Sequence, residues 1–267
     1  MSNYLRIAGN PASGIVLLGD DGAVRSLAQV EPASAWLDSP TAAGFVPGDA
    51  AFASLQGDGT DFVTVAHGTA IRYLNTLGQP HARWKDVAAP PAGTGIAGLA
   101  GAPLEGYLLL ADDGRLYRLD GAAAGGGNAW QACAAPPFSG KATLVAGGWR
   151  HGMLALADGA AAKLASGGAW TALPAPPRAF EMVSGNYQDG FIAYGEGQLF
   201  MLDTGAQPGW RRLGMPNFDL RALSGDPAHG VAAVLADSSG DGTLVAYALL
   251  PGKGPWSLAL APPARRA

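Results

Sequence analysis

Tryptophan recurs along this chain at a nearly constant interval, and this regularity constrains the fold more than any other feature of the sequence. Neighbouring members of the series are 40 to 48 residues apart, and proline follows most of them within a few residues. The series comprises Trp36, Trp84, Trp130, Trp170, Trp210 and Trp256. A period of this length is typical of propellers and of other arrays that stack one supersecondary unit against the next. The sequence therefore predicts six copies of a single structural unit.

Each unit contains patterns that are typical of short β-strands. Apolar runs of four or five residues, such as 153–156 and 191–194, are bounded by Gly or Asp and are too short for helices. Turn dipeptides follow them, as in Asp158-Gly159, and the glycine supplies the positive φ that tight hairpins need. The next run, best seen at 115–119, alternates in polarity and indicates a strand with one buried face.

These patterns predict an all-β, six-bladed β-propeller with four-stranded antiparallel blades, formed by a single domain over residues 1–267. Closing the sheets into a ring protects strand edges that would otherwise promote aggregation. The sequence can fill all six blades in order, although the segment up to Tyr4 could instead complete the last blade and fasten the ring. The approximate blade limits are 1–44, 45–91, 92–137, 138–177, 178–217 and 218–267.

Composition narrows the classes of partner. The net charge is -4 and charged residues make up 14% of the chain, which argues against a nucleic-acid partner and against an anionic membrane surface. Cys133 is the only cysteine, so no intrachain disulfide can form, and this fits a reducing compartment. The sequence contains neither an amino-terminal apolar segment typical of a signal peptide nor a run of about 20 apolar residues. We therefore expect a cytoplasmic protein.

The repeating unit resembles a known family. Trp170-Thr-Ala-Leu-Pro174 leading to Gly185, and residues 210–216 leading to Gly225, are similar to the tectonin repeat. This resemblance implies a six-bladed propeller, and the tachylectin-like members of the family bind glycans or lipopolysaccharide. Residues 145–156 also resemble a regulator-of-chromosome-condensation repeat. The Trp-Gly-x-Asn and Gly-Gln-Leu-Gly parts of that repeat are absent, so it ranks second.

No motif in the chain predicts a catalytic or cofactor site by itself. Residues 93–98 match G-x-G-x-x-G, but Pro90-Pro91 precede them and a short strand follows, so a linker between blades is the favoured interpretation. No two of the four histidines are spaced as local metal ligands, and with one cysteine we expect no metal site and no cofactor. His151 and His229 nevertheless occupy equivalent repeat positions, so a composite site on one face of the ring is possible.

The loops between the first and second strands differ sharply from one unit to another. Loops 10–13 and 102–105 carry little chemistry, and loop 58–61 is acidic, whereas three consecutive later loops are rich in functional side chains. Binding residues tend to lie on loops that a rigid scaffold positions, although these side chains could instead pack over neighbouring loops. The candidate ligand-binding residues are Trp149, Arg150, His151, Asn186, Tyr187, Gln188, Asp189, Asp226 and His229.

These loops favour a non-enzymatic propeller that binds a glycan or other small molecule at one composite site. Trp149 and Tyr187 would stack on an apolar face of the ligand, and the polar residues would bond its polar groups. Trp149 lies outside the regular series and is expected on an exposed loop, so Trp149→Ala should cost far less stability than Trp170→Ala. An enzyme with His151 or His229 as general base and Asp189 orienting it remains an alternative. A protein-interaction scaffold is a further one.

Overall fold

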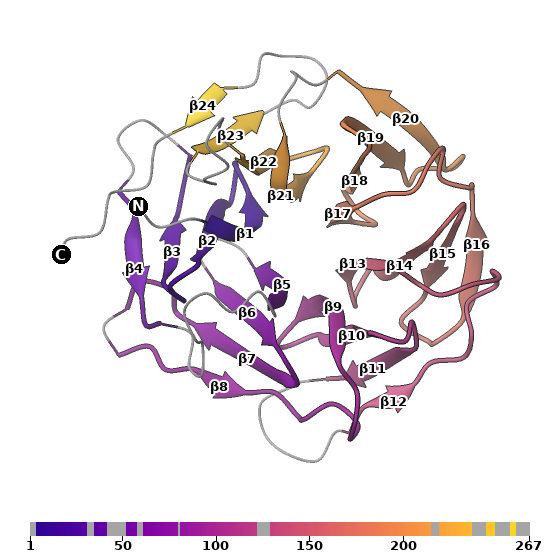
Figure 1. Cartoon of the computed structure of the whole chain (residues 1–267), viewed down its shortest axis with the longest axis horizontal. Coiled ribbons are helices and arrows are strands. Elements are labelled where there is room, and N and C mark those ends of the chain that lie inside the picture. The colour runs from indigo at the N-terminus through magenta and orange to yellow at the C-terminus, as the bar shows by residue number, and fades with distance from the viewer. Residues whose placement is uncertain are drawn as a thin grey trace.

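The computed structural model forms a ring of six four-stranded antiparallel sheets around a central opening (Figure 1), which confirms the predicted six-bladed propeller. It describes residues 4–30, 35–41, 52–57, 61–79, 81–121, 129–214, 219–236, 244–248 and 257–259. Each sheet consists of four strands that are consecutive in sequence. Within the described residues, no helix is long and apolar enough to cross a membrane.

The first three blades run inward to outward in chain order. Their strands are β1 (Tyr4–Asn10), β2 (Gly14–Gly19), β3 (Val24–Leu27), β4 (Leu37–Ser39), β5 (Phe52–Gly57), β6 (Phe62–His67), β7 (Ala70–Asn75), β8 (Lys85–Asp86), β9 (Ile96–Ala102), β10 (Gly106–Ala111), β11 (Leu116–Asp120) and β12 (Gln131–Ala132). Blades four to six repeat the pattern. Their strands are β13 (Leu144–Gly148), β14 (Gly152–Ala157), β15 (Ala160–Leu164), β16 (Trp170–Leu173), β17 (Met182–Asn186), β18 (Gly190–Gly195), β19 (Gln198–Asp203), β20 (Gly209–Leu213), β21 (Leu220–Asp226), β22 (Gly230–Leu235), β23 (Leu244–Ala248) and β24 (Ser257–Ala259).

The hydrophobic core lies between neighbouring blades. The second strand is buried along its whole length in every blade except the second, where only the ends of β6 are partly exposed, and this is why these runs are apolar at consecutive positions. Leu108 and Leu110 of β10 pack with Met153 and Ala155 of β14 in one such inter-blade cluster. Each blade therefore stabilises its neighbours, and the core follows the ring.

The tryptophan series joins adjacent blades through a repeated hydrogen bond. The indole Nε1 of Trp84 donates to the carbonyl oxygen of Pro40 at 3.0 Å, four residues after Trp36 in the preceding blade. The same bond joins Trp130 to Ala88, Trp170 to Ala134 and Trp210 to Pro174, at 2.8 to 3.0 Å. Trp256 lies outside the described residues. The indole Nε1 of Trp36 has no such partner among the described residues, so the regular spacing reflects one contact that is made at four blade boundaries.

The ring closes by side-by-side packing of the first and last blades. Tyr4 and Ile7 of β1 pack with Ala222 of β21 and Val234 of β22. The Ser224 hydroxyl also donates to the carbonyl oxygen of Gly9 at 2.7 Å. Tyr4 belongs to the innermost strand of blade one, so it does not complete the last blade. All six sheets are filled in chain order, without an exchanged strand.

The expectation that Trp149 lies on an exposed loop is wrong. Its backbone is in the β13–β14 turn, but its side chain is half-buried against the inter-blade cluster that contains Leu108 and Met153. A Cβ atom added to Gly106 of the preceding blade would lie 3.4 Å from Trp149 Cγ. A glycine at the start of β10 thus leaves room for the indole, which the isolated turn sequence did not indicate.

We expect Trp149→Ala and Trp170→Ala to lower the free energy of unfolding by similar amounts, about 2–4 kcal/mol each, since both indoles are half-buried against the same cluster. Trp170→Phe should cost about 1 kcal/mol, because it removes the bond to Ala134 and keeps most of the apolar contact. Urea titrations of the three variants provide the measurement. If Trp149→Ala left the free energy of unfolding almost unchanged, the Trp149 side chain would not contribute to the inter-blade cluster.

Candidate functional site

A ring of glycines surrounds one end of the central channel. Each inner strand reaches a glycine at its last or penultimate residue, and all six have a positive φ between 86° and 137°. These residues are Gly9, Gly57, Gly101, Gly147, Gly185 and Gly225. A Cβ atom at Gly185 or Gly225 would overlap the backbone carbonyl of Gly190 or Gly230, at the start of the next strand. Only glycine fits this conformation.

The glycine ring borders a cavity of about 260 Å³. It lies at the end of the channel where the turns between the first and second strands of each blade are located. We call it the turn-end cavity. Its polar lining comes chiefly from blades five, six and one, and comprises Asn10, Gln56, Ser184, Asn186, Ser224 and Asp226. Blades three and four contribute Ala or Gly at the matching positions, for example Ala102 and Gly148. The cavity is therefore polar on one side and plain on the other.

The residue after the ring glycine caps its own turn in three blades. Asn10 Oδ1 accepts the backbone amides of Ala12 and Ser13 at 3.0 and 2.8 Å. Asn186 Oδ1 does the same for its turn, at 2.8 and 3.0 Å. Asp226 Oδ1 accepts the amides of Ala228 and His229 at 2.9 and 2.8 Å. An Asn or Asp side chain that bonds the backbone two residues on is a typical turn former.

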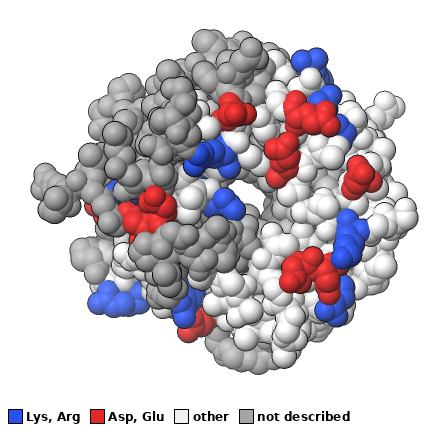
Figure 2. Space-filling view, viewed as in Figure 1, with Lys and Arg blue, Asp and Glu red and all other residues white. Residues whose placement is uncertain are grey.

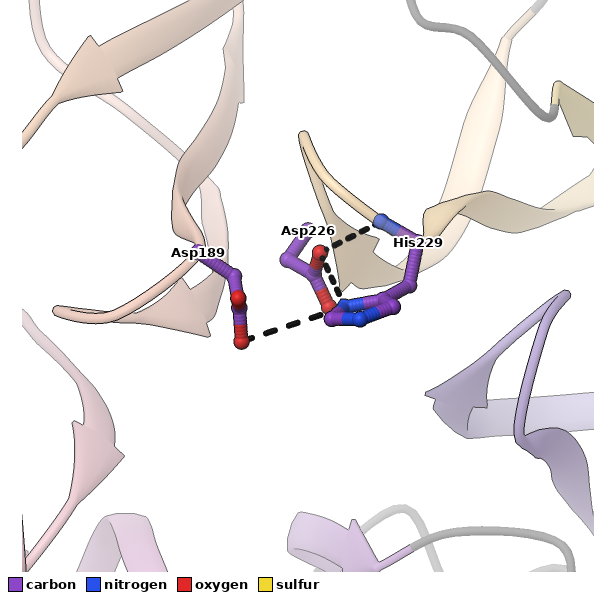
Figure 3. Close-up of side chains that lie close together, drawn as sticks. All are labelled: Asp189, Asp226 and His229. Atoms are coloured by element: carbon purple, nitrogen blue, oxygen red, sulfur yellow. Dashed lines mark hydrogen bonds and ion pairs between the residues drawn. The ribbon is translucent and has the colours of Figure 1, made fainter.

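Asp226 connects this turn to an imidazole. The Nδ1 atom of His229 lies 3.0 Å from Asp226 Oδ1 and 3.8 Å from Asp189 Oδ2, so two carboxylates face the same nitrogen of the ring (Figure 3). The Asp226 side chain is only 6% exposed, whereas the His229 side chain is 47% exposed. Asn10 of blade one approaches from the other side, with its amide nitrogen 3.5 Å from Asp226 Oδ2. Three blades thus meet at one buried carboxylate.

The surroundings of Asp226 alter its acidity. Burial raises the pKa of its carboxyl above the ordinary value, and the nearby Asp189 carboxylate acts in the same direction. The amide hydrogen bond from His229 and the charge of its ring act in the opposite direction. In the tautomer that carries its proton on Nδ1, the ring donates a hydrogen bond to Asp226. Nε2 is then the acceptor nitrogen of a half-exposed ring.

The same three side chains could hold a divalent cation. One ligand atom from each of Asp189, Asp226 and His229 lies within 4.8 Å of the others. Sequence spacing did not indicate this grouping, because the residues come from turns of two adjacent blades, and the expectation of no metal site stays a prediction. Two carboxylate oxygens and one imidazole nitrogen suit a borderline or hard divalent ion. However, Asp226 Oδ1 already accepts two amides and faces Nδ1, so an ion would compete with these bonds.

The structure brings four of the nine candidate residues together: Asn186, Asp189, Asp226 and His229. Asn186 Nδ2 donates to Asp189 Oδ2 at 2.9 Å, and Asp189 in turn faces His229. The amide of Asn186 therefore orients the second carboxylate of the cluster. Asp226 lies closer to the His229 ring than Asp189 does, and the role of Asp189 in orienting that ring stays a prediction.

The remaining candidates do not join this cluster. Tyr187 is half-buried, packs edge-on against Phe191 at 4.9 Å, and lies under the Lys163 ammonium at 4.1 Å. Burial raises the pKa of its hydroxyl, which has no hydrogen-bond partner in the described part of the chain. Trp149 packs between blades, as described above. The other three, Arg150, His151 and Gln188, have exposed side chains.

Sequence reasoning missed Asn10, whose loop it judged to carry little chemistry. Asn10 lines the turn-end cavity and faces Asp226 across the junction of the first and last blades. Its equivalence to Asn186 and Asp226, each directly after the ring glycine, is visible in the sequence. An alignment of the repeats on that glycine would have found it.

No protein-family model matches the chain, and no curated protein matches its sequence. Solved structures do match in fold. A streptogramin B lyase has a TM-score of 0.59 at 10% identity, over 97% of this chain and 91% of that chain. A catalytically inactive histidine-to-alanine variant of virginiamycin B lyase from Staphylococcus aureus, with quinupristin, has a TM-score of 0.56 at 11% identity. The match covers 93% of this chain and 92% of that chain. YCF48 from Cyanidioschyzon merolae has a TM-score of 0.55 at 11% identity, and the match covers 96% of this chain and 85% of that chain. At these identities the likeness shows the propeller fold alone.

Proposed function

We propose that this propeller binds a small hydroxyl-rich molecule, such as a single glycan residue, in the turn-end cavity. The observation that carries the proposal is the buried Asp226 carboxylate in the cavity wall. Its Oδ1 accepts hydrogen bonds from the turn and faces His229, whereas within the described residues its Oδ2 has only the 3.5 Å contact from Asn10. A buried carboxylate oxygen with spare acceptor capacity favours a ligand that donates hydrogen bonds.

The lining of the cavity supports a neutral or cationic ligand. It contains carboxamide, hydroxyl and carboxylate groups, and among the described residues that line it there is no Lys or Arg. A volume of about 260 Å³ is near the lower limit of small-molecule pockets, so one sugar ring suits it better than a long oligosaccharide. Lectin-like recognition agrees with the tectonin resemblance. Because Trp149 and Tyr187 are engaged in packing, we assign recognition to hydrogen bonds.

A calorimetric titration with a panel of neutral monosaccharides, sugar acids and amino sugars tests the proposal. We expect a neutral or amino sugar to bind the wild-type protein, and Asp226→Asn to weaken that binding. Sugar acids should bind less well than their neutral counterparts, because Asp226 and Asp189 repel them. Tighter binding of the acids, or no difference between wild type and variant, would remove Asp226 from recognition.

A second candidate is an acid–base enzyme, which the Asp226–His229 pair favours. A carboxylate on Nδ1 fixes the tautomer and leaves Nε2 of the exposed ring free to take a proton from a substrate. Because lyases are among the similar structures, quinupristin is the first substrate to try. If the protein is such an enzyme, we expect chromatography to show turnover by wild type that His229→Ala lowers at least a hundredfold. His151→Ala is the matched control and should keep full turnover.

A further inference from the structure

The central channel contains a second cavity, of about 320 Å³, at the end opposite the glycine ring. We call it the arginine-end cavity. Both cavities are lined by Ile7, Leu55, Val183 and Leu223, so they meet at one apolar level of the inner strands. Leu99 and Val145 occupy the corresponding positions in blades three and four and also line the arginine-end cavity. A girdle of aliphatic side chains, with Gln56 beside it, thus lies where two chemically different cavities meet.

The arginine-end cavity is basic where the turn-end cavity is acidic. Arg6 of β1 and Arg221 of β21 line it, and these strands belong to the first and last blades, which pack side by side. Figure 2 shows Lys or Arg side chains at the edge of the central opening on the face viewed there. Thr143 and Gln56 add a hydroxyl and a carboxamide to the lining. Polar and cationic groups therefore converge at this end of the channel.

Among the described residues that line this cavity there are two guanidinium groups and one carboxylate. Glu181 lines the cavity, but one of its carboxylate oxygens accepts the backbone amide of Glu196 at 3.1 Å. Arg221 has no ion pair with any residue in the described ranges. Arg6 is half-buried, and burial lowers the pKa of its guanidinium. The half-buried Arg6 and the exposed Arg221 thus line one cavity, and a guanidinium group forms its strongest hydrogen bonds with anions that carry oxygen acceptors.

We propose that the arginine-end cavity binds an oxyanion, a carboxylate or phosphate group, between Arg6 and Arg221. Planar guanidinium groups match both anions through paired hydrogen bonds, which Lys cannot reproduce. The site is distinct from the sugar site proposed above, because Arg6 and Arg221 do not line the turn-end cavity and Asp226 does not line this one. The two ends of the channel thus select ligands of opposite charge.

Calorimetry with inorganic phosphate and with citrate, at constant ionic strength with chloride as the balancing salt, tests the proposal. We expect at least one of the two anions to bind wild type, and Arg221→Gln to weaken that binding about tenfold. Arg221→Lys should restore only part of the affinity, because it keeps the charge and loses the fork geometry. Phosphate binding without citrate identifies a phosphate site, and the reverse identifies a carboxylate site.

Arg212→Gln is the matched control, since Arg212 is an exposed arginine on the outer strand β20. It should bind both anions as wild type does. Equal losses in Arg212→Gln and Arg221→Gln, or binding of neither anion by wild type, would overturn the proposal. Asp226→Asn should leave anion affinity unchanged, so failure of the sugar site and failure of the anion site give different results.

Discussion

Gly225→Ala is expected to destabilise the protein by about 3–5 kcal/mol, which is enough to lower the yield of folded protein. Gly225 has a φ of 108°, and a Cβ atom there would overlap the carbonyl oxygen of Gly230 and approach Val231 Cα. The two penalties add, because one arises from the backbone conformation and the other from contact with backbone that cannot move aside. Thermal or urea unfolding of the purified variant measures the loss.

Substitutions at two other glycines distinguish the cost of the backbone conformation from the cost of the steric overlap. Gly197 has a φ of 72°, but nothing lies within 4 Å of an added Cβ, so Gly197→Ala should cost only about 1 kcal/mol. Gly209 has neither a positive φ nor a neighbour within 4 Å, and Gly209→Ala should be close to neutral. Equal losses in all three variants would mean that the glycine ring has no special structural role.

The sequence predicted the fold because the repeat is a physical contact that recurs. Trp84, Trp130, Trp170 and Trp210 each donate a hydrogen bond to the preceding blade, so their spacing follows the size of a blade. The apolar runs in the sequence are the buried second strands, because these strands pack between neighbouring blades. Pattern reasoning succeeds here because the contacts between blades are alike.

The site was harder to predict because it depends on where the blades differ. Asn186, Asp189, Asp226 and His229 could be chosen by chemistry, but their grouping requires contacts between turns of two blades. Asn10 joins them only because residues about 216 positions apart meet where the ring closes. The position of Trp149 was predicted wrongly, because its indole packs into space that Gly106 of another blade leaves open by having no side chain. Single-sequence patterns carry no information about such pairings.

Asp226→Asn is expected to remove ligand binding from the turn-end cavity while leaving the fold intact. Asn10 and Asn186 already cap the equivalent turns through Oδ1, so an asparagine should cap the third turn equally well. The charged acceptor is lost, and a hydrogen bond to a charged group contributes about 1.5–3 kcal/mol, so affinity should fall at least tenfold. Asp158→Asn, in the exposed β14–β15 turn, is the control and should bind normally.

The stability of this variant should depend on pH in a defined direction. Burial raises the pKa of Asp226 in the folded protein above its ordinary value of 3.8, so ionisation of this carboxyl opposes folding. Below the ordinary value the residue is neutral in both states, and wild type and Asp226→Asn should have similar melting temperatures. As pH rises through the raised pKa, wild type loses stability that the amide keeps, and the variant should become the more stable protein. Melting curves from acid to neutral pH check this, and a variant that is less stable at neutral pH would show that the charge on Asp226 stabilises the fold through His229.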